Sequence, residues 1–312
     1  MFTPQPAPDR SPDPFRRLAA SGQQVAVTGA TGWFGRVTLD LLAAAMGREA
    51  FRSRVAVYAS RSRRLAVAGV GEVVARPLAE LEPAEVLLHY AFVTRTQIPE
   101  DERDAFVAAN VAITARVLQA VRSGAVRRLL VTSSGAALRP DLDANPYGAL
   151  KALDELVFPE ACRRAGVACV VARVFNVAGA HMTQPDDYAL GDLIRQVRAG
   201  GPVRIGAAGA VVRSFTGVEE IVATAVGELL EDRGGCFETG GSQIVEIEEL
   251  AAVVRRVLGR GEMAIERWRD PRAPESVYLG DPERLRELAA RHGVRLRGLD
   301  ELVAATAEGL SA

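Results

Sequence analysis

The chain has 312 residues, 38 basic and 39 acidic, so its net charge is close to zero, and no basic stripe interleaved with aromatic residues marks a nucleic-acid surface. Its longest apolar runs, such as 41–46, are far shorter than the roughly 20 residues of a membrane span. We therefore expect a cytoplasmic protein with no nucleic-acid or membrane partner. Three cysteines stand without metal-ligand spacing, so neither a metal site nor a disulfide framework is predicted.

The predicted elements alternate between strand and helix. Residues 1–21 begin with a proline-rich stretch and are expected to form a disordered tail. Apolar β-type runs follow at 24–28, 54–59, 72–75, 86–91, 128–132 and 167–175. Helical patterns separate several of these runs, notably at 102–122 and 147–164. Pro159 falls inside the second of these helices, where it should bend or end it.

Such alternation predicts an α/β fold, a Rossmann-type doubly wound parallel sheet over residues 22–180. Beyond residue 180 the pattern loosens into short strands and helical patterns at 187–199, 218–231, 247–258, 282–291 and 299–309. We interpret residues 181–312 mainly as a smaller C-terminal α/β cap that binds substrate, with some segments returning to the first domain.

A glycine-rich turn joins the first predicted strand to the first helix. Gly29, Gly32 and Gly35 stand where glycine permits a tight turn, close approach of a pyrophosphate and close packing of helix on sheet. The helix start then offers unpaired N–H groups to phosphates. The turn therefore predicts a dinucleotide site formed by Gly29, Thr31, Gly32, Trp33, Phe34 and Gly35.

Lys151 is the only lysine among 38 basic residues. Arginine replaces lysine wherever only charge is needed, so a lone lysine points to a position that requires an ammonium. Tyr147 stands four residues earlier, on the same helix face. An ammonium beside a phenol stabilises the phenolate and lowers its pKa from about 10, which favours proton exchange with a substrate hydroxyl or carbonyl. Ser134, at the end of the preceding strand, can donate a hydrogen bond to the same oxygen.

The order and spacing of these motifs, from about residue 24 to the C-terminus, resemble the extended branch of the short-chain dehydrogenase/reductase family. Besides the Thr-Gly-x-x-Gly-x-x-Gly turn, the matching segments are His89-Tyr-Ala91, Asn110-Val111, Val131-Thr-Ser-Ser134, Pro146-Tyr-Gly-Ala-Leu-Lys151, Arg173-Val-Phe-Asn176-Val-Ala-Gly179 and Arg213-Ser-Phe-Thr-Gly-Val-Glu-Glu220.

The resemblance implies a role for each matching residue. It makes Tyr147 the acid/base, Lys151 a pKa modifier and ribose ligand, and Ser134 the polarising group. Asn110 would stabilise a helix kink that holds in place a water molecule bound to Lys151. Ala91 would contact the cofactor. Asn176, Arg213 and, on the cap, Arg272 would bind the diphosphate of a nucleotide sugar. A homodimer formed by helices 102–122 and 147–164 is implied too, although burial in the monomer explains the same apolar faces.

The residues at the end of the second predicted strand indicate which cofactor, NAD or NADP, is preferred. An acidic residue there would hold the ribose hydroxyls of NAD, whereas cations and hydroxyls favour the 2′-phosphate of NADP. This strand is followed by Ser60, Arg61 and Arg63 with no carboxylate, so NADP is preferred over NAD. A solvated arginine-rich loop is the alternative interpretation.

The two residues after Ser134 restrict which reactions the protein is expected to catalyse. Dehydratases of the resembled family carry an acidic pair there, whereas this chain has Gly135 and Ala136, so a 4,6-dehydratase is disfavoured. We expect hydride transfer at a carbinol or keto carbon of a nucleotide sugar, first as a keto-sugar reductase and alternatively as an epimerase that retains NAD. A non-catalytic dinucleotide sensor is the third hypothesis, but such a protein would usually lose Tyr147 or Lys151.

Overall fold

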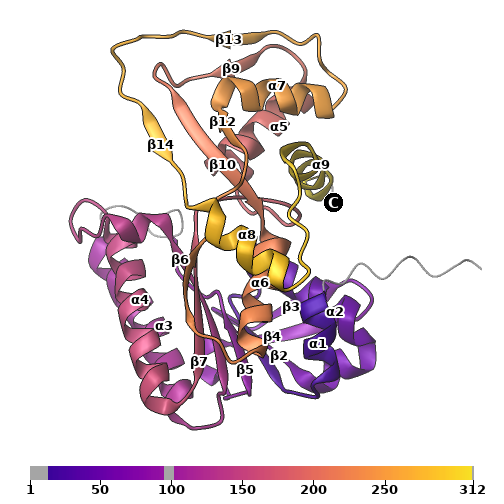
Figure 1. Cartoon of the computed structure of the whole chain (residues 1–312), viewed down its shortest axis with the longest axis vertical. Coiled ribbons are helices and arrows are strands. Elements are labelled where there is room, and N and C mark those ends of the chain that lie inside the picture. The colour runs from indigo at the N-terminus through magenta and orange to yellow at the C-terminus, as the bar shows by residue number, and fades with distance from the viewer. Residues whose placement is uncertain (1–12, 95–101, 311–312) are drawn as a thin grey trace, which may run out of the picture.

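The computed structural model describes residues 13–94 and 102–310 (Figure 1). Residues 1–12 of the expected tail lie outside the described residues. Helix α1 (Asp13–Ala20), however, falls within the segment predicted to be disordered, and here the structure corrects the prediction. Phe15 and Leu18, three residues apart, are fully buried, because this one apolar stripe packs onto α2 (Trp33–Arg54) and α6 (Val218–Leu230).

The described residues form a central sheet of eight strands in the order β11-β7-β6-β5-β1-β2-β4-β3. All neighbours are parallel except the edge strand β3, which runs antiparallel to β4. Every residue of β1 and β5 is buried, as expected for strands covered on both faces. The predicted Rossmann-type sheet is thus confirmed. The strand bounds are β1 Val25–Thr28, β2 Val55–Ala59, β3 Arg63–Val67, β4 Gly71–Pro77, β5 Val86–His89, β6 Arg128–Ser134, β7 Ala168–Val174 and β11 Gly235–Glu238.

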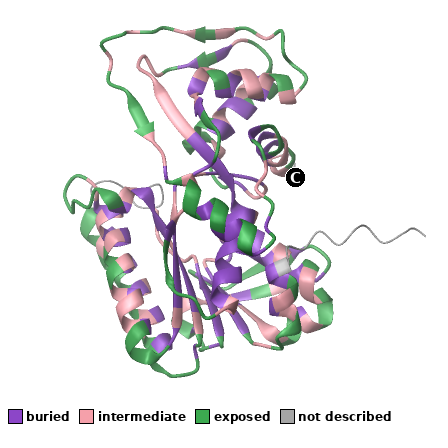
Figure 2. Ribbon diagram, viewed as in Figure 1, coloured by how far each residue is buried: buried purple, intermediate pink, exposed green. Residues whose placement is uncertain are grey.

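Helices cover both faces of this sheet, whose strands are largely buried in Figure 2. α3 (Arg103–Arg122) and α4 (Pro146–Ala165) lie on one face, and α4 continues through Pro159 to its end at Ala165. The other face carries α1 together with α2 (Trp33–Arg54), α6 (Val218–Leu230) and α8 (Pro282–Arg291). Since α6, α8 and β11 all come from beyond residue 180, the chain returns to the first domain several times.

The cap has its own apolar core, beneath helices α5 (Ala189–Ala199), α7 (Ile247–Val257) and α9 (Leu299–Gly309). Strand β10 is its centre, pairing with β8, β12 and β14, while β9 pairs with β13. The bounds of these strands are β8 Asn176–Ala178, β9 Val203–Ile205, β10 Val211–Gly217, β12 Ile244–Glu246, β13 Ile265–Arg267 and β14 Ser276–Tyr278. Because β10 runs directly into α6, the cap is joined firmly to the sheet domain.

Among the described residues, α3 is the one helix long and apolar enough to cross a membrane by length and composition. Core helices of globular proteins satisfy the same test. In this fold α3 packs against α4, and its Asn110 and Thr114 side chains are buried in protein contacts.

Candidate active site

A cavity of about 380 Å³ opens where the carboxyl ends of the central strands face the cap. Such a position, at the carboxyl edge of a parallel sheet, is where α/β proteins of this topology bind ligands. The wall contains Gly29, Gly32, Trp33, Phe34 and Gly35 from the glycine turn, Tyr90, Phe92, Thr94, Thr132, Ser134, Tyr147 and Lys151 from the sheet domain, and Val174, Phe175, Asn176, Val177, Thr183, Gln184, Tyr188 and Tyr278 from β7 onward.

The glycine turn has the geometry of a dinucleotide cradle. Gly29 has a positive φ of 69°, and a Cβ there would lie 2.6 Å from the Ala91 nitrogen. A Cβ on Gly35 would overlap the Gly29 carbonyl, whereas one on Gly32 meets only that oxygen, at 3.4 Å. α2 begins at Trp33 without a side-chain cap, so its first N–H groups are available to an anion. The turn therefore fits a pyrophosphate, and half-buried Thr31 lies within it.

Two residues of α4 bring a phenol and an ammonium to this cavity. Asn145 caps the helix, accepting a hydrogen bond from the Gly148 N–H at 3.0 Å, and thereby fixes the turn that carries Tyr147. Lys151 Nζ donates to the Thr132 carbonyl at 2.9 Å and lies 6.0 Å from the centre of the Tyr147 ring. Ser134, at the end of β6, lines the same cavity, so three of the four predicted catalytic side chains lie together, and the fourth, Asn110, lies outside the cavity wall.

Burial controls the ionisation of both groups. It raises the pKa of Tyr147 to about 12, although a hydrogen bond with Ser134 opposes this rise. It also lowers the pKa of Lys151 to about 8, opposed by Asp154 and Glu155. In this state the tyrosine therefore holds its proton firmly, whereas the sequence alone leads us to expect a lowered tyrosine pKa.

Asn110 is buried on α3 and binds the backbone that follows β5. Its Oδ1 accepts the Val93 N–H at 2.8 Å, and its Nδ2 donates to the carbonyls of Val93 at 3.2 Å and Phe106 at 3.1 Å. The residue thus fixes the loop of Ala91 against the helix. The role implied by the family resemblance, holding a water for the lysine, stays a prediction.

The candidate NADP residues lie at the end of β2, outside the cavity wall. Ser60, Arg61 and Arg63 are all exposed, and Arg63 begins β3. Within residues 13–94 and 102–310 no ion pair involves Arg61 or Arg63. The Ala30 N–H donates to the Tyr58 carbonyl at 3.0 Å, so the end of β2 lies beside the glycine turn.

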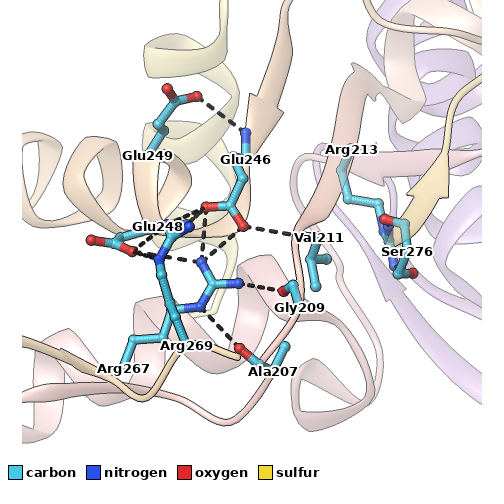
Figure 3. A network of polar contacts seen from close by, with 10 residues as sticks. All are labelled: Ala207, Gly209, Val211, Arg213, Glu246, Glu248, Glu249, Arg267, Arg269 and Ser276. Carbon is cyan, nitrogen blue, oxygen red and sulfur yellow. Dashed lines mark hydrogen bonds and ion pairs between the residues drawn. The ribbon is translucent and has the colours of Figure 1, made fainter. Parts of the chain in front are cut away.

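Only one of the three candidate diphosphate ligands, Asn176, lines the cavity. Asn176 lines the cavity, but its Nδ2 donates to the carbonyls of Ser214 and Tyr278, at 3.2 and 3.1 Å. Arg213 donates to the Ser276 carbonyl at 2.6 Å and hydroxyl at 2.9 Å (Figure 3). Neither Arg213 nor the exposed Arg272 belongs to the cavity wall.

Figure 3 also shows how the cap holds β10, the strand that carries Arg213. The buried guanidinium of Arg267 donates to the Glu246 carboxylate at 2.8 and 3.0 Å and to the carbonyls of Ala207 and Gly209. Glu246 in turn accepts the Val211 N–H of β10 at 3.1 Å. These contacts serve the cap architecture rather than the cavity.

Sequence reasoning missed several residues of the cavity wall. Tyr278, on β14 of the cap, places its Oη 3.3 Å from Ser134 Oγ. Tyr188 meets Trp33 edge to face at 5.7 Å, and Phe92 lies against Lys151. Tyr278 is 144 residues from Ser134 along the chain, so only the fold brings the two hydroxyls together.

Each of the three histidines contacts a polar side chain from another part of the chain. His89 is buried, its Nδ1 is 2.7 Å from Thr28 Oγ1, and burial lowers its pKa to about 3. His181 Nε2 lies 2.5 Å from Asp40 Oδ2 and so ties the loop after β8 to α2. His292 contacts Glu228 at 2.7 Å in a network that also includes Arg291.

The sequence profile of the NAD dependent epimerase/dehydratase family matches residues 25–235, more than half of the chain. No curated protein matches the chain. Many solved structures share the fold, among them two 4-epimerases and a dehydratase. The UDP-N-acetylglucosamine 4-epimerase of Methanobrevibacter ruminantium M1, in complex with UDP-N-acetylmuramic acid, has TM-score 0.73 and 18% identity, over 93% of this chain and 98% of that chain. The NDP-hexosamine 5,6-dehydratase TunA has TM-score 0.71 and 18% identity over 93% and 98%.

The UDP-glucose 4-epimerase of Thermus thermophilus, in complex with NAD, has TM-score 0.67 and 20% identity, over 93% of this chain and 99% of that chain. These likenesses show the shared fold. Together with the profile match, the glycine cradle and the gathered serine, tyrosine and lysine, they identify the chain as a member of the NAD dependent epimerase/dehydratase family.

Proposed function

We propose that the protein is a cytoplasmic NAD(P)-dependent oxidoreductase that transfers hydride at a keto or carbinol carbon of a nucleotide sugar, acting chiefly as a keto-sugar reductase. The observation that carries this proposal is that Ser134, Tyr147 and Lys151 line one cavity with the glycine cradle. Fold alone would not give the reaction, because one fold supports many activities.

In the proposed reduction, the Tyr147 hydroxyl gives its proton to the substrate carbonyl oxygen, and Ser134 donates a hydrogen bond to the same oxygen. Lys151 stabilises the phenolate left behind. A reduced nicotinamide cofactor, which the glycine turn of Gly29, Gly32 and Gly35 would hold, would supply the hydride. Burial raises the pKa of Tyr147, so the phenol holds the proton that this step transfers.

The crowding around Gly135 supports disfavouring a 4,6-dehydratase. A Cβ at this position would overlap the Phe175 ring and lie 2.7 Å from Tyr278 Oη. An acidic side chain therefore has no space there unless both aromatic residues move. The similar fold of a 5,6-dehydratase does not bear on this point, which rests on the residues of this chain.

We propose NADP as the cofactor, because Ser60, Arg61 and Arg63 follow β2 and no carboxylate is present to hold the NAD ribose. NAD is the alternative. Asn176, Arg213 and Arg272 remain the candidate diphosphate ligands. Arg213 and Arg272 lie outside the cavity wall, so they would bind a diphosphate that extends beyond this cavity or after a change in side-chain position.

The second candidate function is an epimerase that retains NAD. The NAD-bound 4-epimerase of similar fold is the observation that favours it. A reductase exchanges its cofactor at each turnover, whereas an epimerase ends with the same oxidised cofactor. A sensor without catalysis is disfavoured because Tyr147 and Lys151 are both kept.

We also propose a homodimer formed through α3 and α4. Phe106, Val117 and Leu150 of these helices are buried in the monomer. Leu153 and Leu156, in contrast, are 38% and 71% exposed, although they belong to the same apolar pattern. A second copy placed against them would remove this apolar surface from water.

The test is a mass spectrum of any nucleotide released when the purified protein is denatured, combined with fluorescence titrations of NADH and NADPH. Release of little nucleotide and preferential, exchangeable binding of NADPH support the reductase. Tightly retained NAD would instead favour the epimerase, and binding of neither cofactor would contradict both.

A further inference from the structure

Phe92 contacts both ionisable groups of the proposed catalytic site. Lys151 Nζ lies 3.8 Å from the centre of the Phe92 ring, within the range of a cation–π interaction. The same ring meets Tyr147 at 5.4 Å with an interplanar angle of 83°, which is an edge-to-face contact. One aromatic side chain therefore lies beside the ammonium and the phenol that the mechanism uses.

The ammonium has few other partners to stabilise its charge. Its one hydrogen bond goes to the Thr132 carbonyl, and no salt bridge among residues 13–94 and 102–310 includes Lys151. The nearby carboxylates have partners of their own. Asp154 accepts from Thr114 at 2.7 Å, and Glu155 accepts from Arg173 at 2.9 and 2.6 Å.

An aromatic face differs from a carboxylate in one important respect. It stabilises a cation through its quadrupole but carries no net charge. A paired carboxylate would cancel the field of the ammonium, whereas a ring leaves that field available to the Tyr147 phenolate. Near Lys151 the titratable groups are Tyr147, Asp154 and Glu155 on its own helix and His89 on β5.

The position of Phe92 is fixed by its surroundings. Asn110 holds both backbone groups of the next residue, Val93, by the hydrogen bonds at 2.8 and 3.2 Å. Phe106 packs against the Phe92 ring at 6.2 Å with an interplanar angle of 70°. Since Asn110 and Phe106 both belong to α3, this helix sets where the ring stands relative to α4.

We infer that Phe92 is a positioning residue, whose ring, fixed by Asn110, keeps the Lys151 ammonium charged and beside Tyr147. This inference rests on the proposed function for its catalytic meaning, but the contact itself can be tested without turnover. It also gives Asn110 a role that the structure shows directly, through the backbone of Val93 rather than through a water.

The test uses the fact that Lys151 is the only lysine. Protein grown on lysine labelled with ¹³C at Cε gives a single side-chain signal, whose shift against pH reports the pKa of Lys151. Phe92→Leu removes the aromatic face, and we expect it to lower this pKa by about one unit, a tenfold change in the ionisation constant. Phe92→Tyr keeps a ring and should preserve the wild-type value.

Phe34→Leu is the matched control, because Phe34 lines the same cavity but packs on Tyr90 at 5.8 Å. It should leave the Lys151 titration unchanged. If Phe92→Leu does not fold, fluorinated phenylalanines at position 92 weaken the ring face without changing its shape, and the pKa should fall with each added fluorine. An unchanged pKa in the leucine variant or across the fluorinated series would overturn the inference.

Titrations of NADH and NADPH on the same samples separate this inference from the proposed function. A wild-type protein that binds neither cofactor refutes the proposed function, whatever the lysine titration shows. Conversely, normal cofactor binding with a lysine pKa insensitive to the ring refutes only the role of Phe92.

Discussion

The crowding around Gly135 can be tested by adding a single methyl group at this position. In Gly135→Ala the new Cβ would overlap the Phe175 ring and lie 2.7 Å from Tyr278 Oη. Phe175 is 8% exposed, and the two rings pack at 4.9 Å, so neither can move without disturbing the other. Because Tyr278 also contacts Ser134, the substitution disturbs stability and the reacting site together.

Overpacking of this kind costs about 1–3 kcal/mol of unfolding free energy. For a chain of this size that corresponds to a lower melting temperature by about 1.5–5 °C. Gly135→Asp, which restores the first acidic residue of a dehydratase, adds a poorly solvated charge and should cost more. We expect no dehydratase activity to appear in it.

The assay is thermal and urea unfolding of Gly135→Ala, Phe175→Leu and the double variant. If the Phe175 ring causes the cost, Gly135→Ala should destabilise less in the Phe175→Leu background, with a coupling of about 0.5–3 kcal/mol. Additive effects, or an alanine variant as stable as the wild type, would refute the steric argument and with it the case against an acidic residue there.

Three further predictions concern pH, assembly and cofactor choice. Burial lowers the pKa of His89 to about 3 from 6.5, so between these pH values the unfolded chain binds a proton at this residue and the folded chain does not. As pH falls through this range, the unfolding free energy therefore falls by up to about 1.4 kcal/mol per pH unit. His89→Asn should flatten this slope in urea titrations, and an equal slope in the variant contradicts the assignment. Leu156→Glu should give a monomer in sedimentation velocity, whereas Val74→Glu, at another exposed apolar position, should not; a monomeric wild type would show the dimer proposal to be wrong. Replacing Arg61 and Arg63 together by glutamate should weaken NADPH binding about 10- to 100-fold and NADH binding much less, and equal losses would argue against the NADP assignment.

The regular part of the fold was predictable because its signals are local. The apolar runs of β1 and β5 and the helical patterns of α8 and α9 follow from periodicity and turn residues within the segments themselves. α1 was missed because its apolar stripe is short and lies close to a proline-rich stretch. Its stability comes from packing on α2 and α6, which no local pattern reveals.

The site was predictable only in part, for the same reason. Ser134, Tyr147 and Lys151 stand at spacings that fix them on one strand end and one helix face, so motif reasoning brings them together. Phe92 and Tyr278 carry no motif, and their contacts with this group arise from a loop position and from the return of the cap.

The arginines show that residue type and family resemblance do not determine which contacts a side chain makes in the fold. Arg213 was predicted as a diphosphate ligand from a family segment, yet in the structure its guanidinium holds Ser276 across two cap strands. In a chain so rich in arginine, many guanidinium groups serve backbone carbonyls and carboxylates within the fold, as Arg267 does.

The central claim is that Tyr147 acts as the acid/base that transfers the proton, whereas the cofactor would supply the hydride. The most direct test compares wild type with Tyr147→Phe, measuring turnover of NADPH with a panel of nucleotide-linked keto-sugars and, separately, the affinity for NADPH. We predict that turnover falls by about 10²- to 10⁴-fold while cofactor affinity is nearly unchanged. Full turnover in the phenylalanine variant would contradict the account.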